Sequence, residues 1–387
     1  MTRDPLSPSR PTSEEYRMLS VKAAVARSKG GPFSVEDVLL APPRADEVLV
    51  RLVATGLCHT DLLALDQILP PGLPAVLGHE GSGVVQAVGE AVTTLAPGDP
   101  VVLAPMSCGS CRPCLTGHPM HCASFLPLNL RGRRADGSTA YRDAAGAEIS
   151  GHFFGQSSFA DHVVAHQRSV VKVRADAPLE LLGPLGCGLQ TGAGAVLGVF
   201  AAPPGSSLVV FGAGPVGLAA VMAARIAGCT RIIAVDLHRG RLDLALELGA
   251  TDVLDGGQDA VAAAVVELSG GGVDFALDAV GLPQTARAAV ESLTTGGTAG
   301  IVGSAGTGQD LSVGLVQMLG RTVKGILQGD SVPALLIPRL LDFFMAGRFP
   351  LDKLIRPYPL ADINQAVADA TGGTAVKPLL LHHHSGG

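Results

Sequence analysis

Residues 207–217 read Ser-Leu-Val-Val-Phe-Gly-Ala-Gly-Pro-Val-Gly, and this stretch decides the fold. Its apolar beginning is typical of a buried strand, and the apolar residues from Val216 to Ala227 fit a helix. A second strand-like run, Arg231 to Val235, ends beside Asp236, about twenty residues beyond the glycines, as a dinucleotide-binding βαβ unit requires. Strands and helical stretches alternate from here to about residue 324. This α/β pattern predicts a doubly wound parallel sheet of the Rossmann type.

Each glycine of this stretch has a structural reason. Gly212 allows the tight turn after the strand, Gly214 lets the backbone approach a pyrophosphate, and Gly217 lets the helix pack close to the strand. Pro215 and Val216 are further predicted cofactor contacts, because the N–H groups and dipole at the N-terminus of the helix favour phosphate. A glycine-rich turn without a ligand is the alternative interpretation, but the strand–turn–helix context and the trailing acid argue against it. We predict that these residues bind a dinucleotide.

The acid at the end of the second strand favours NAD over NADP. Asp236 is expected to accept hydrogen bonds from the adenosine ribose. A carboxylate about 4 Å from an added 2′-phosphate would cost about 4 kcal/mol at an effective dielectric of about 20, and solvent would reduce that cost. Arg239 and Arg241 are close enough in sequence to offset part of the repulsion, and Arg241 is a candidate cofactor contact. We therefore expect NAD, with NADP as the less favoured cofactor.

Composition excludes several classes of function. The chain has 387 residues, 47% of them hydrophobic and 16% charged, which is enough for two cores. A net charge of −6 argues against nucleic acid as a partner. The apolar stretch 207–227 is long enough to mimic a membrane span, but its glycines and Arg225 fit a strand, turn and helix better. Residues 1–17 lack the apolar core of a secretory signal, so we expect a flexible arm on a cytoplasmic protein. We interpret the histidines at 382–384 as a tag remnant or tail.

The rest of the chain has a different organisation. From about Val21 to Val173, short β-type runs such as Glu47–Val53 are broken by glycine and proline. After Val332-Pro333 we expect a helix, Ala334 to Ala346, and a closing segment that rejoins the first domain. The expected domains are residues 1–188 (β-rich, including the arm), 189–331 (dinucleotide-binding) and 332–387 (the return), with a cleft between the two bodies.

Four cysteines form the pattern C-x2-C-x2-C-x7-C: Cys108, Cys111, Cys114 and Cys122. In a cytoplasmic chain such a cluster indicates a metal and not disulfides. Four thiolates without an open position suit a closed tetrahedral structural zinc. An iron–sulfur cluster is the main alternative, although the spacing differs from the bacterial ferredoxin run. We expect His118 and His121, which lie within the loop, to be solvated and not ligands.

Five motifs, in this order, carry a resemblance to a known family. They are Gly-Leu-Cys-His-Thr-Asp (56–61), Gly-His-Glu-Gly-Ser-Gly-Val-Val (78–85), the four-cysteine loop, Gly-Cys-Gly-Leu-Gln-Thr-Gly-Ala-Gly-Ala-Val (186–196) and Val-Val-Phe-Gly-Ala-Gly-Pro-Val-Gly (209–217). From about Met18 to Leu381 the chain resembles the zinc-containing medium-chain alcohol dehydrogenases. The resemblance implies a GroES-like, mostly β catalytic domain beside the Rossmann domain.

The resemblance also implies two zinc ions and hydride transfer between an alcohol and NAD. Cys58, His79 and Cys187 would hold the catalytic zinc. This Cys2His set is the one known from alcohol dehydrogenases, and it leaves one tetrahedral position for a substrate oxygen. The four-cysteine loop would hold the structural zinc.

Other residues match positions around the metal and the cofactor in the same family. Thr60 would hydrogen-bond the alcohol oxygen and start a proton relay, and Asp61 would orient the metal-bound imidazole. Glu80 would lie beside the metal. His59 and Lys377 match positions that approach the cofactor pyrophosphate, although an exposed histidine without a role is the alternative for His59.

One position departs from the family pattern. Many members have a histidine three residues after the relay hydroxyl, and this chain has Leu63 there. We therefore hypothesise that protons leave through the cofactor ribose to water, or through another group.

Within the family, residues 152–159 and 183–191 are similar to the aryl-alcohol (benzyl-alcohol) branch, which implies a primary aromatic or allylic alcohol, or its aldehyde, as substrate. Apolar pocket candidates are Leu62, Leu63, Ala104, Phe125 and Phe153. The long segment between Cys122 and Gly155 is similar to that of dimeric relatives, which favours a homodimer over a tetramer.

Three alternatives remain open. One is a related enzyme, either a glutathione-dependent formaldehyde dehydrogenase or a specialised carbonyl reductase. Another is a non-enzymatic zinc- and cofactor-binding protein, which the presence of Cys58, His79 and Cys187 argues against. The third is thiol chemistry at the cysteine loop, which would require cysteines free of metal.

Overall fold

The structure is a computed structural model that describes residues 18–69, 71–303 and 308–382. The expected flexible arm, residues 1–17, and His383 and His384 lie outside these ranges. His382 lies inside them and is buried, with its Nε2 3.0 Å from Thr55 Oγ1. The interpretation of 382–384 as a mere tail is therefore wrong for His382, which is part of the fold.

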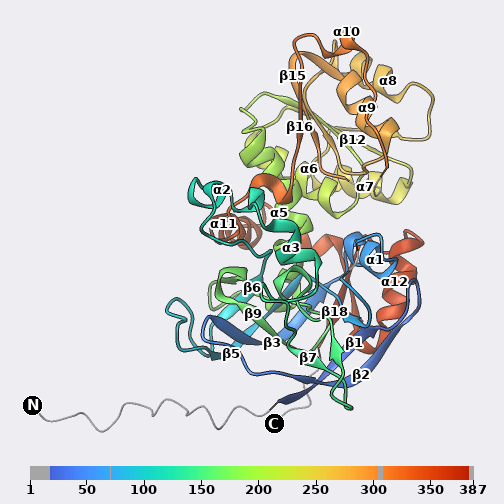
Figure 1. The fold of residues 1–387 in the computed structure, drawn as a ribbon. Coiled ribbons are helices and arrows are strands. Elements are labelled where there is room, and N and C mark those ends of the chain that lie inside the picture. Colours follow the sequence, from blue (N-terminus) through green and yellow to red (C-terminus); the bar gives the residue numbers. More distant parts are fainter. Residues whose placement is uncertain (1–17, 70, 304–307, 383–387) are drawn as a thin grey trace, which may run out of the picture.

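The dinucleotide-binding part is a six-stranded parallel sheet, shown as the upper body in Figure 1. Its spatial order is β13-β12-β11-β14-β15-β16, the strand order of a Rossmann fold. The strands are β11 (Ser207–Phe211), β12 (Arg231–Asp236), β13 (Asp252–Asp255), β14 (Val273–Asp278), β15 (Leu293–Ile301) and β16 (Thr322–Gly325). The predicted fold class is thereby confirmed.

Both faces of this sheet are covered, which explains why β11 is apolar throughout. Leu208 and Val210 belong to the core that includes residues of α6 and α7, whereas Val209 and Phe211 belong to the core that includes residues of α8 and α9. The helices are α6 (Pro215–Ala227), α7 (Arg239–Leu248), α8 (Val261–Ser269), α9 (Pro283–Glu291) and the short α10 (Leu315–Met318). Gly228 ends α6 as its C-cap in the left-handed conformation, with φ of 86°, which glycine adopts without steric strain.

The second body consists of two mostly antiparallel sheets. One has the order β4-β1-β2-β7-β8, with β1 (Leu19–Ala26), β2 (Phe33–Leu40), β4 (Ala75–Val76), β7 (Tyr141–Arg142) and β8 (Glu148–Ile149). The other has the order β10-β6-β5-β3-β18-β17, with β9 also paired to β3. Its strands are β3 (Glu47–Gly56), β5 (Gly81–Val88), β6 (Pro100–Leu103), β9 (His162–His166), β10 (Val170–Lys172), β17 (Ile355–Pro359) and β18 (Lys377–Leu381).

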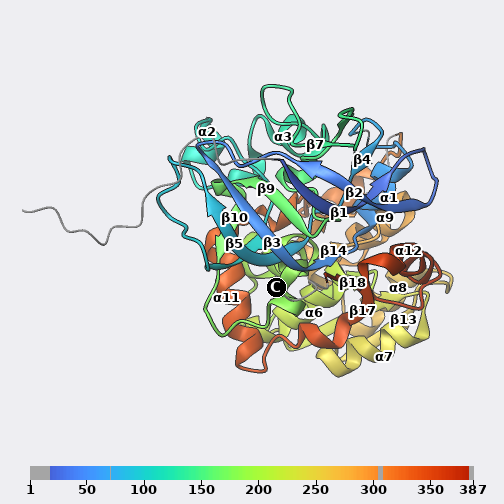
Figure 2. The ribbon, with the colours of Figure 1, turned by 90° about the horizontal axis from the view of Figure 1, so that it is seen from below.

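The C-terminal strand returns to this body. β18 pairs antiparallel with β3 and parallel with β17, and the two strands lie beside α12 (Ile363–Thr371) in Figure 2. The predicted helix after Val332 is α11 (Pro333–Met345), one residue earlier at each end than expected. None of the helices in the described ranges has the length and apolarity that crossing a bilayer requires.

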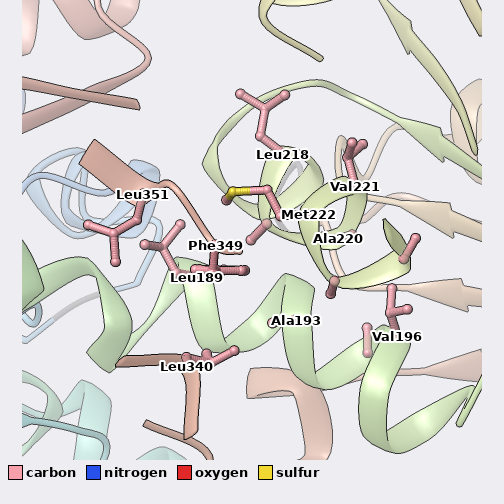
Figure 3. Close-up of a cluster of buried hydrophobic side chains, with 14 of the residues drawn as sticks. Leu189, Ala193, Val196, Leu218, Ala220, Val221, Met222, Leu340, Phe349 and Leu351 are labelled. Atoms are coloured by element: carbon pink, nitrogen blue, oxygen red, sulfur yellow. The ribbon is translucent and has the colours of Figure 1, made fainter. Parts of the chain in front are cut away.

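A continuous apolar core joins the two bodies. In Figure 3, Leu189 and Ala193 of α5 (Gly188–Gly194) lie beside Leu218 and Met222 of α6, with Leu340 of α11 close by. Close approach of α5 and α6 depends on glycine, because a Cβ at Gly192 would lie 1.9 Å from a carbonyl oxygen of α6. α5 begins immediately after Cys187, so this packing positions a candidate metal ligand.

Candidate active site and metal centres

The N-terminus of α1 (His59–Leu65) gathers the first group of site residues. Cys58 is the N-cap, and Asp61 at the third helical position accepts a hydrogen bond from the Cys58 N–H to Oδ2, at 3.0 Å. A carboxylate there also interacts favourably with the helix dipole. Helix capping therefore holds one carboxylate oxygen of Asp61 in place.

The other oxygen of Asp61 orients His79. Asp61 Oδ1 lies 2.9 Å from His79 Nδ1 and accepts the Gly78 N–H at 3.0 Å. Because a carboxylate only accepts, Nδ1 carries a proton, which leaves Nε2 as the nitrogen that can bind a metal. Both side chains are fully buried, and His79 Nε2 has no hydrogen-bond partner among the described residues.

Cys58, His79, Glu80 and Cys187 come together although they are far apart in the sequence. One ligand atom of each lies within 4.8 Å of those of the other three. A hydrogen bond from Cys187 lowers the pKa of the Cys58 thiol well below its usual value, against the effect of burial. Burial opposes the charged form of His79, but Asp61 and Cys58 raise the pKa of His79 well above its ordinary value. A buried imidazole lone pair beside two thiol groups fits a zinc ion, which explains the unpartnered Nε2.

Glu80 is held by a buried ion pair with Lys377. Lys377 Nζ lies 2.6 Å from Glu80 Oε2 and donates to the Leu57 carbonyl oxygen at 2.9 Å. Burial raises the pKa of Glu80, while the Lys377 ammonium acts in the opposite direction. Lys377, expected at the pyrophosphate, is thus turned toward the metal cluster, and it is not among the residues that line the dinucleotide cavity.

The remaining predicted residues of α1 lie at the edge of this cluster. Thr60 is half-buried, with Oγ1 3.7 Å from Cys58 Sγ, while His59 is exposed. Leu63, the position that departs from the family pattern, is half-buried one turn further along. The Thr60 hydroxyl therefore lies beside a candidate metal ligand.

Phe154 is an aromatic neighbour of His79 that is absent from the pocket residues predicted from the sequence. Its ring stacks on that of His79, with centroids 4.5 Å apart and planes at 25°, and its φ of 52° is unusual for a non-glycine residue. Phe153, a predicted pocket residue, also contacts His79 edge-on, with ring centroids 5.6 Å apart, and both phenylalanines are buried in one apolar cluster. Ala104 is fully buried. Gln328 also lies at the cluster, with its Nε2 3.5 Å from Cys187 Sγ. The spacing of residues in the sequence identifies neither Phe154 nor Gln328 as a site residue.

The four cysteines of the loop also meet. Their sulfur atoms all lie within 4.8 Å of one another, with Cys108–Cys114 at 3.9 Å and Cys111–Cys114 at 3.5 Å. Sulfurs bound to one tetrahedral zinc at about 2.3 Å would be about 3.8 Å apart. Backbone N–H groups of Ser110 and Cys111 lower the pKa of Cys108 to about 5, which favours the thiolate. This geometry fits a closed zinc site.

The dinucleotide motif lines a cavity of about 600 Å³. Gly212 has φ of 91°, and a Cβ at Gly217 would lie 1.8 Å from the Gly212 carbonyl oxygen. A Cβ at Gly214 would meet nothing within 4 Å, so this glycine leaves open space above the N-terminus of α6. The helix begins at Pro215, one residue before the predicted start at Val216.

Asp236 lies at the floor of this cavity, with its carboxylate fixed by the backbone. Oδ2 accepts the Ala213 N–H at 2.7 Å, and Oδ1 accepts the His238 N–H at 2.8 Å. Arg241 also lines the cavity, with Nη1 4.0 Å from Asp236 Oδ2. Four of the predicted cofactor contacts line this cavity, namely Gly212, Gly214, Asp236 and Arg241. The others do not line it: His59, Pro215, Val216, Gly217 and Lys377.

A Rossmann sheet beside a buried Cys2His cluster and a four-cysteine loop defines a zinc-dependent dehydrogenase. A family model for the alcohol dehydrogenase GroES-like domain matches residues 44–175, and one for zinc-binding dehydrogenases matches residues 215–344. The chain belongs to the zinc-containing medium-chain alcohol dehydrogenase family. It is therefore an enzyme of the alcohol dehydrogenase class, whose members use zinc and a nicotinamide cofactor.

Individual relatives are similar over nearly the whole chain. Geraniol dehydrogenase of Castellaniella defragrans is 47% identical over 94% of this chain and 98% of its own length. An alcohol dehydrogenase zinc-binding domain protein of Burkholderia ambifaria is 52% identical, with a TM-score of 0.94 over 95% of this chain and 100% of that chain. Benzyl alcohol dehydrogenase of Acinetobacter calcoaceticus is 42% identical, with a TM-score of 0.91 and the same coverage.

Proposed function

We propose that this enzyme interconverts primary aromatic or allylic alcohols and their aldehydes, with NAD as the hydride carrier and two zinc ions per chain. The observation that carries this proposal is the buried cluster of Cys58, His79 and Cys187, whose imidazole presents an unpartnered nitrogen beneath the Phe154 ring. The names of two relatives, geraniol dehydrogenase and benzyl alcohol dehydrogenase, support the same substrate class.

Each residue around the cluster has a different role in the proposed reaction. Zinc held by Cys58, His79 and Cys187 would supply Lewis acidity toward the substrate oxygen. Asp61 holds the imidazole in the tautomer that presents Nε2 to the site. The Thr60 hydroxyl accepts the alcohol proton and passes it outward. Leu63 cannot continue that relay, so a proton held at Thr60 would need another route to water, for which a bound cofactor would supply its ribose hydroxyl groups or the protein another group.

The walls of the site set the substrate class. Phe154 is stacked on His79 and also lies edge-on to Phe125, with ring centroids 6.4 Å apart. Such a wall favours a flat ring or a double bond next to the reacting carbon, because aromatic edges and faces attract one another. Exclusion of water by these rings also protects the developing charge.

NAD is the cofactor that Asp236 favours. Its carboxylate is held at the cavity floor by two backbone N–H groups and keeps acceptor capacity for the ribose hydroxyls. An added 2′-phosphate would be repelled by this charge, and Arg241 at 4.0 Å offsets only part of the repulsion.

The decisive test is NADH formation by the zinc-loaded enzyme with benzyl alcohol, cinnamyl alcohol, geraniol and ethanol, repeated with NADP+. We expect kcat/KM for the first three to exceed that for ethanol by at least tenfold, with NAD+ preferred. Turnover that requires glutathione and formaldehyde, or reduction of other carbonyls alone, would replace the proposal with one of the related activities. Protein that binds NAD and zinc without any turnover would indicate a binding role.

The assembly and the location of the enzyme stay predictions. We propose a homodimer, with a tetramer as the alternative, and sedimentation at micromolar chain concentration distinguishes the two. A cytoplasmic location and a small apolar molecule as the only substrate partner remain expectations from the sequence.

A further inference from the structure

A third group of potential metal ligands lies outside the two zinc sites. Among the described residues it consists of His118, His121 and Asp330, whose ligand atoms lie within 4.8 Å of one another. One carboxylate oxygen, Asp330 Oδ1, is 3.1 Å from His118 Nδ1 and 3.3 Å from His121 Nε2. Both histidines are exposed to solvent, as expected from the sequence, and both imidazoles also contact one carboxylate, that of Asp330.

The separations fit a bound metal ion. Zinc binds imidazole nitrogen at about 2.0–2.1 Å and carboxylate oxygen at about 2.0–2.2 Å, so two such ligands of a tetrahedral ion are about 3.4 Å apart. The observed 3.1 and 3.3 Å are close to that value. Two imidazoles and one carboxylate are ligands that suit divalent transition metals, and they leave positions for water.

The fold holds the ligands in place from two sides. His118 and His121 flank η1 (Pro119–His121) in the cysteine loop, and the two rings are stacked with planes 10° apart. Asp330 belongs to η6 (Gln328–Asp330), where all three residues have positive φ. Asp330 keeps its φ of 45° although this conformation is unfavourable for a non-glycine residue, because its side chain is 8% exposed and enclosed.

We propose that His118, His121 and Asp330 bind a third divalent transition-metal ion, zinc or a similar metal, that clamps the cysteine loop to η6. The half-exposed imidazoles leave a path for the ion from solvent. Lys324, whose Nζ lies 3.7 Å from Asp330 Oδ2, opposes the ion by charge repulsion and makes the site weaker than the two cysteine sites. The clamp adjoins the catalytic cluster, because Gln328 of the same η6 contacts Cys187.

The experiment compares bound zinc in the full-length enzyme and in single variants, so it depends neither on activity nor on the number of other zincs. All proteins carry His383→Ala and His384→Ala, which removes the terminal histidines as a source of extra binding. The test variants are His118→Asn and Asp330→Asn. The matched control is His166→Asn, because His166 Nε2 lies 3.3 Å from Asp46 and forms a comparable histidine–aspartate pair. Zinc per chain is measured by elemental analysis after equilibration at free Zn2+ raised through the micromolar range.

We expect the parent and His166→Asn to bind one more zinc per chain than His118→Asn and Asp330→Asn. Loss of a residue that hydrogen-bonds a metal ligand typically weakens metal binding by about 10–100-fold. Loss of a ligand itself should weaken zinc binding at this site by more than that. Lys324→Gln should tighten it by about threefold or more, because a positive charge is removed. His118→Asn changes only a half-exposed side chain. Equal zinc content in the parent and in this variant would overturn the proposal, and the three residues would then form only a hydrogen-bonded contact. Should Asp330→Asn fail to fold, the comparison with His118→Asn still decides.

Discussion

The cysteine loop and the buried Cys2His cluster are both candidate zinc sites, but the chain builds them in opposite ways. In the loop, four ligands come from fifteen consecutive residues, 108–122, and short backbone N–H contacts to sulfur hold them. In the cluster, Cys58, His79 and Cys187 come from three separate segments, and a buried aspartate and the packing of α5 on α6 fix their positions. The first site depends on local chain geometry and the second on the whole fold.

We expect the cysteine loop to contribute mainly to stability and the Cys2His cluster mainly to catalysis. A site with four thiolates has no position for substrate and contributes to folding by binding its metal. A site with three protein ligands keeps one position for substrate and is enclosed by aromatic rings. Removing a ligand should therefore have different consequences in the two places.

The largest effect is expected at the cluster. Cys187→Ser removes a catalytic zinc ligand, and kcat/KM should fall by at least about 10³-fold because the electrophile is lost. The melting temperature should change by only a few degrees, since serine fits the same space. Steady-state kinetics with calorimetry on the same samples measures both. Activity within tenfold of the parent would show that Cys187 is not a ligand.

In the loop we expect the reverse. Cys111→Ser should release about one zinc per chain and destabilise the protein by about 2 kcal/mol, or roughly 5 °C in melting temperature. Well below the melting temperature, kcat should stay within about threefold of the parent, because the catalytic cluster is intact. Thermal unfolding and elemental analysis measure the outcome. Loss of activity without loss of stability would contradict the contrast between the two sites.

Asp61→Asn sharpens the contrast inside the cluster. Asn accepts the hydrogen bond from His79 less strongly, so zinc affinity or kcat should fall by about 10–100-fold. Asp66→Asn, at the exposed C-terminal end of the same helix, is the control. Equal behaviour of the two variants would show that the orientation of His79 does not depend on the buried carboxylate.

The same contrast explains how much the sequence could predict. The cysteine spacing and the glycine motif are local patterns, and the loop and the Rossmann sheet follow from them. The resemblance to known dehydrogenases was needed to join Cys58, His79 and Cys187. Phe154, Gln328 and the His118–His121–Asp330 contact depend on the packing of distant segments, which leaves no periodic signal. Lys377 fits a family position, but its orientation depends on Glu80, whose buried charge needs a partner.

A smaller effect is expected at the cofactor site. Asp236→Asn removes the charge and keeps an oxygen that can accept the Ala213 N–H. The ratio of kcat/KM for NADP+ to that for NAD+ should rise roughly tenfold. A charge repulsion of about 4 kcal/mol would imply a larger change, but solvent in the cavity screens the repulsion. Asp255→Asn, at the end of the neighbouring strand β13, is the matched control. A parent enzyme that already prefers NADP+ would contradict the role of Asp236.

The smallest effect concerns the outer end of the proton path, where the cluster lacks the histidine of many relatives. Leu63→His introduces a group with an ordinary pKa of about 6.5, and its neutral form can accept a proton from the relay. Because the base works only when neutral, kcat for alcohol oxidation should rise by roughly two- to threefold as the pH passes above that value, and be unchanged below it. Leu63→Gln, polar without titrating in this range, should show no such rise. A pH profile of kcat that is identical in all three enzymes would mean that proton release does not limit turnover and that the missing histidine has no effect on the rate.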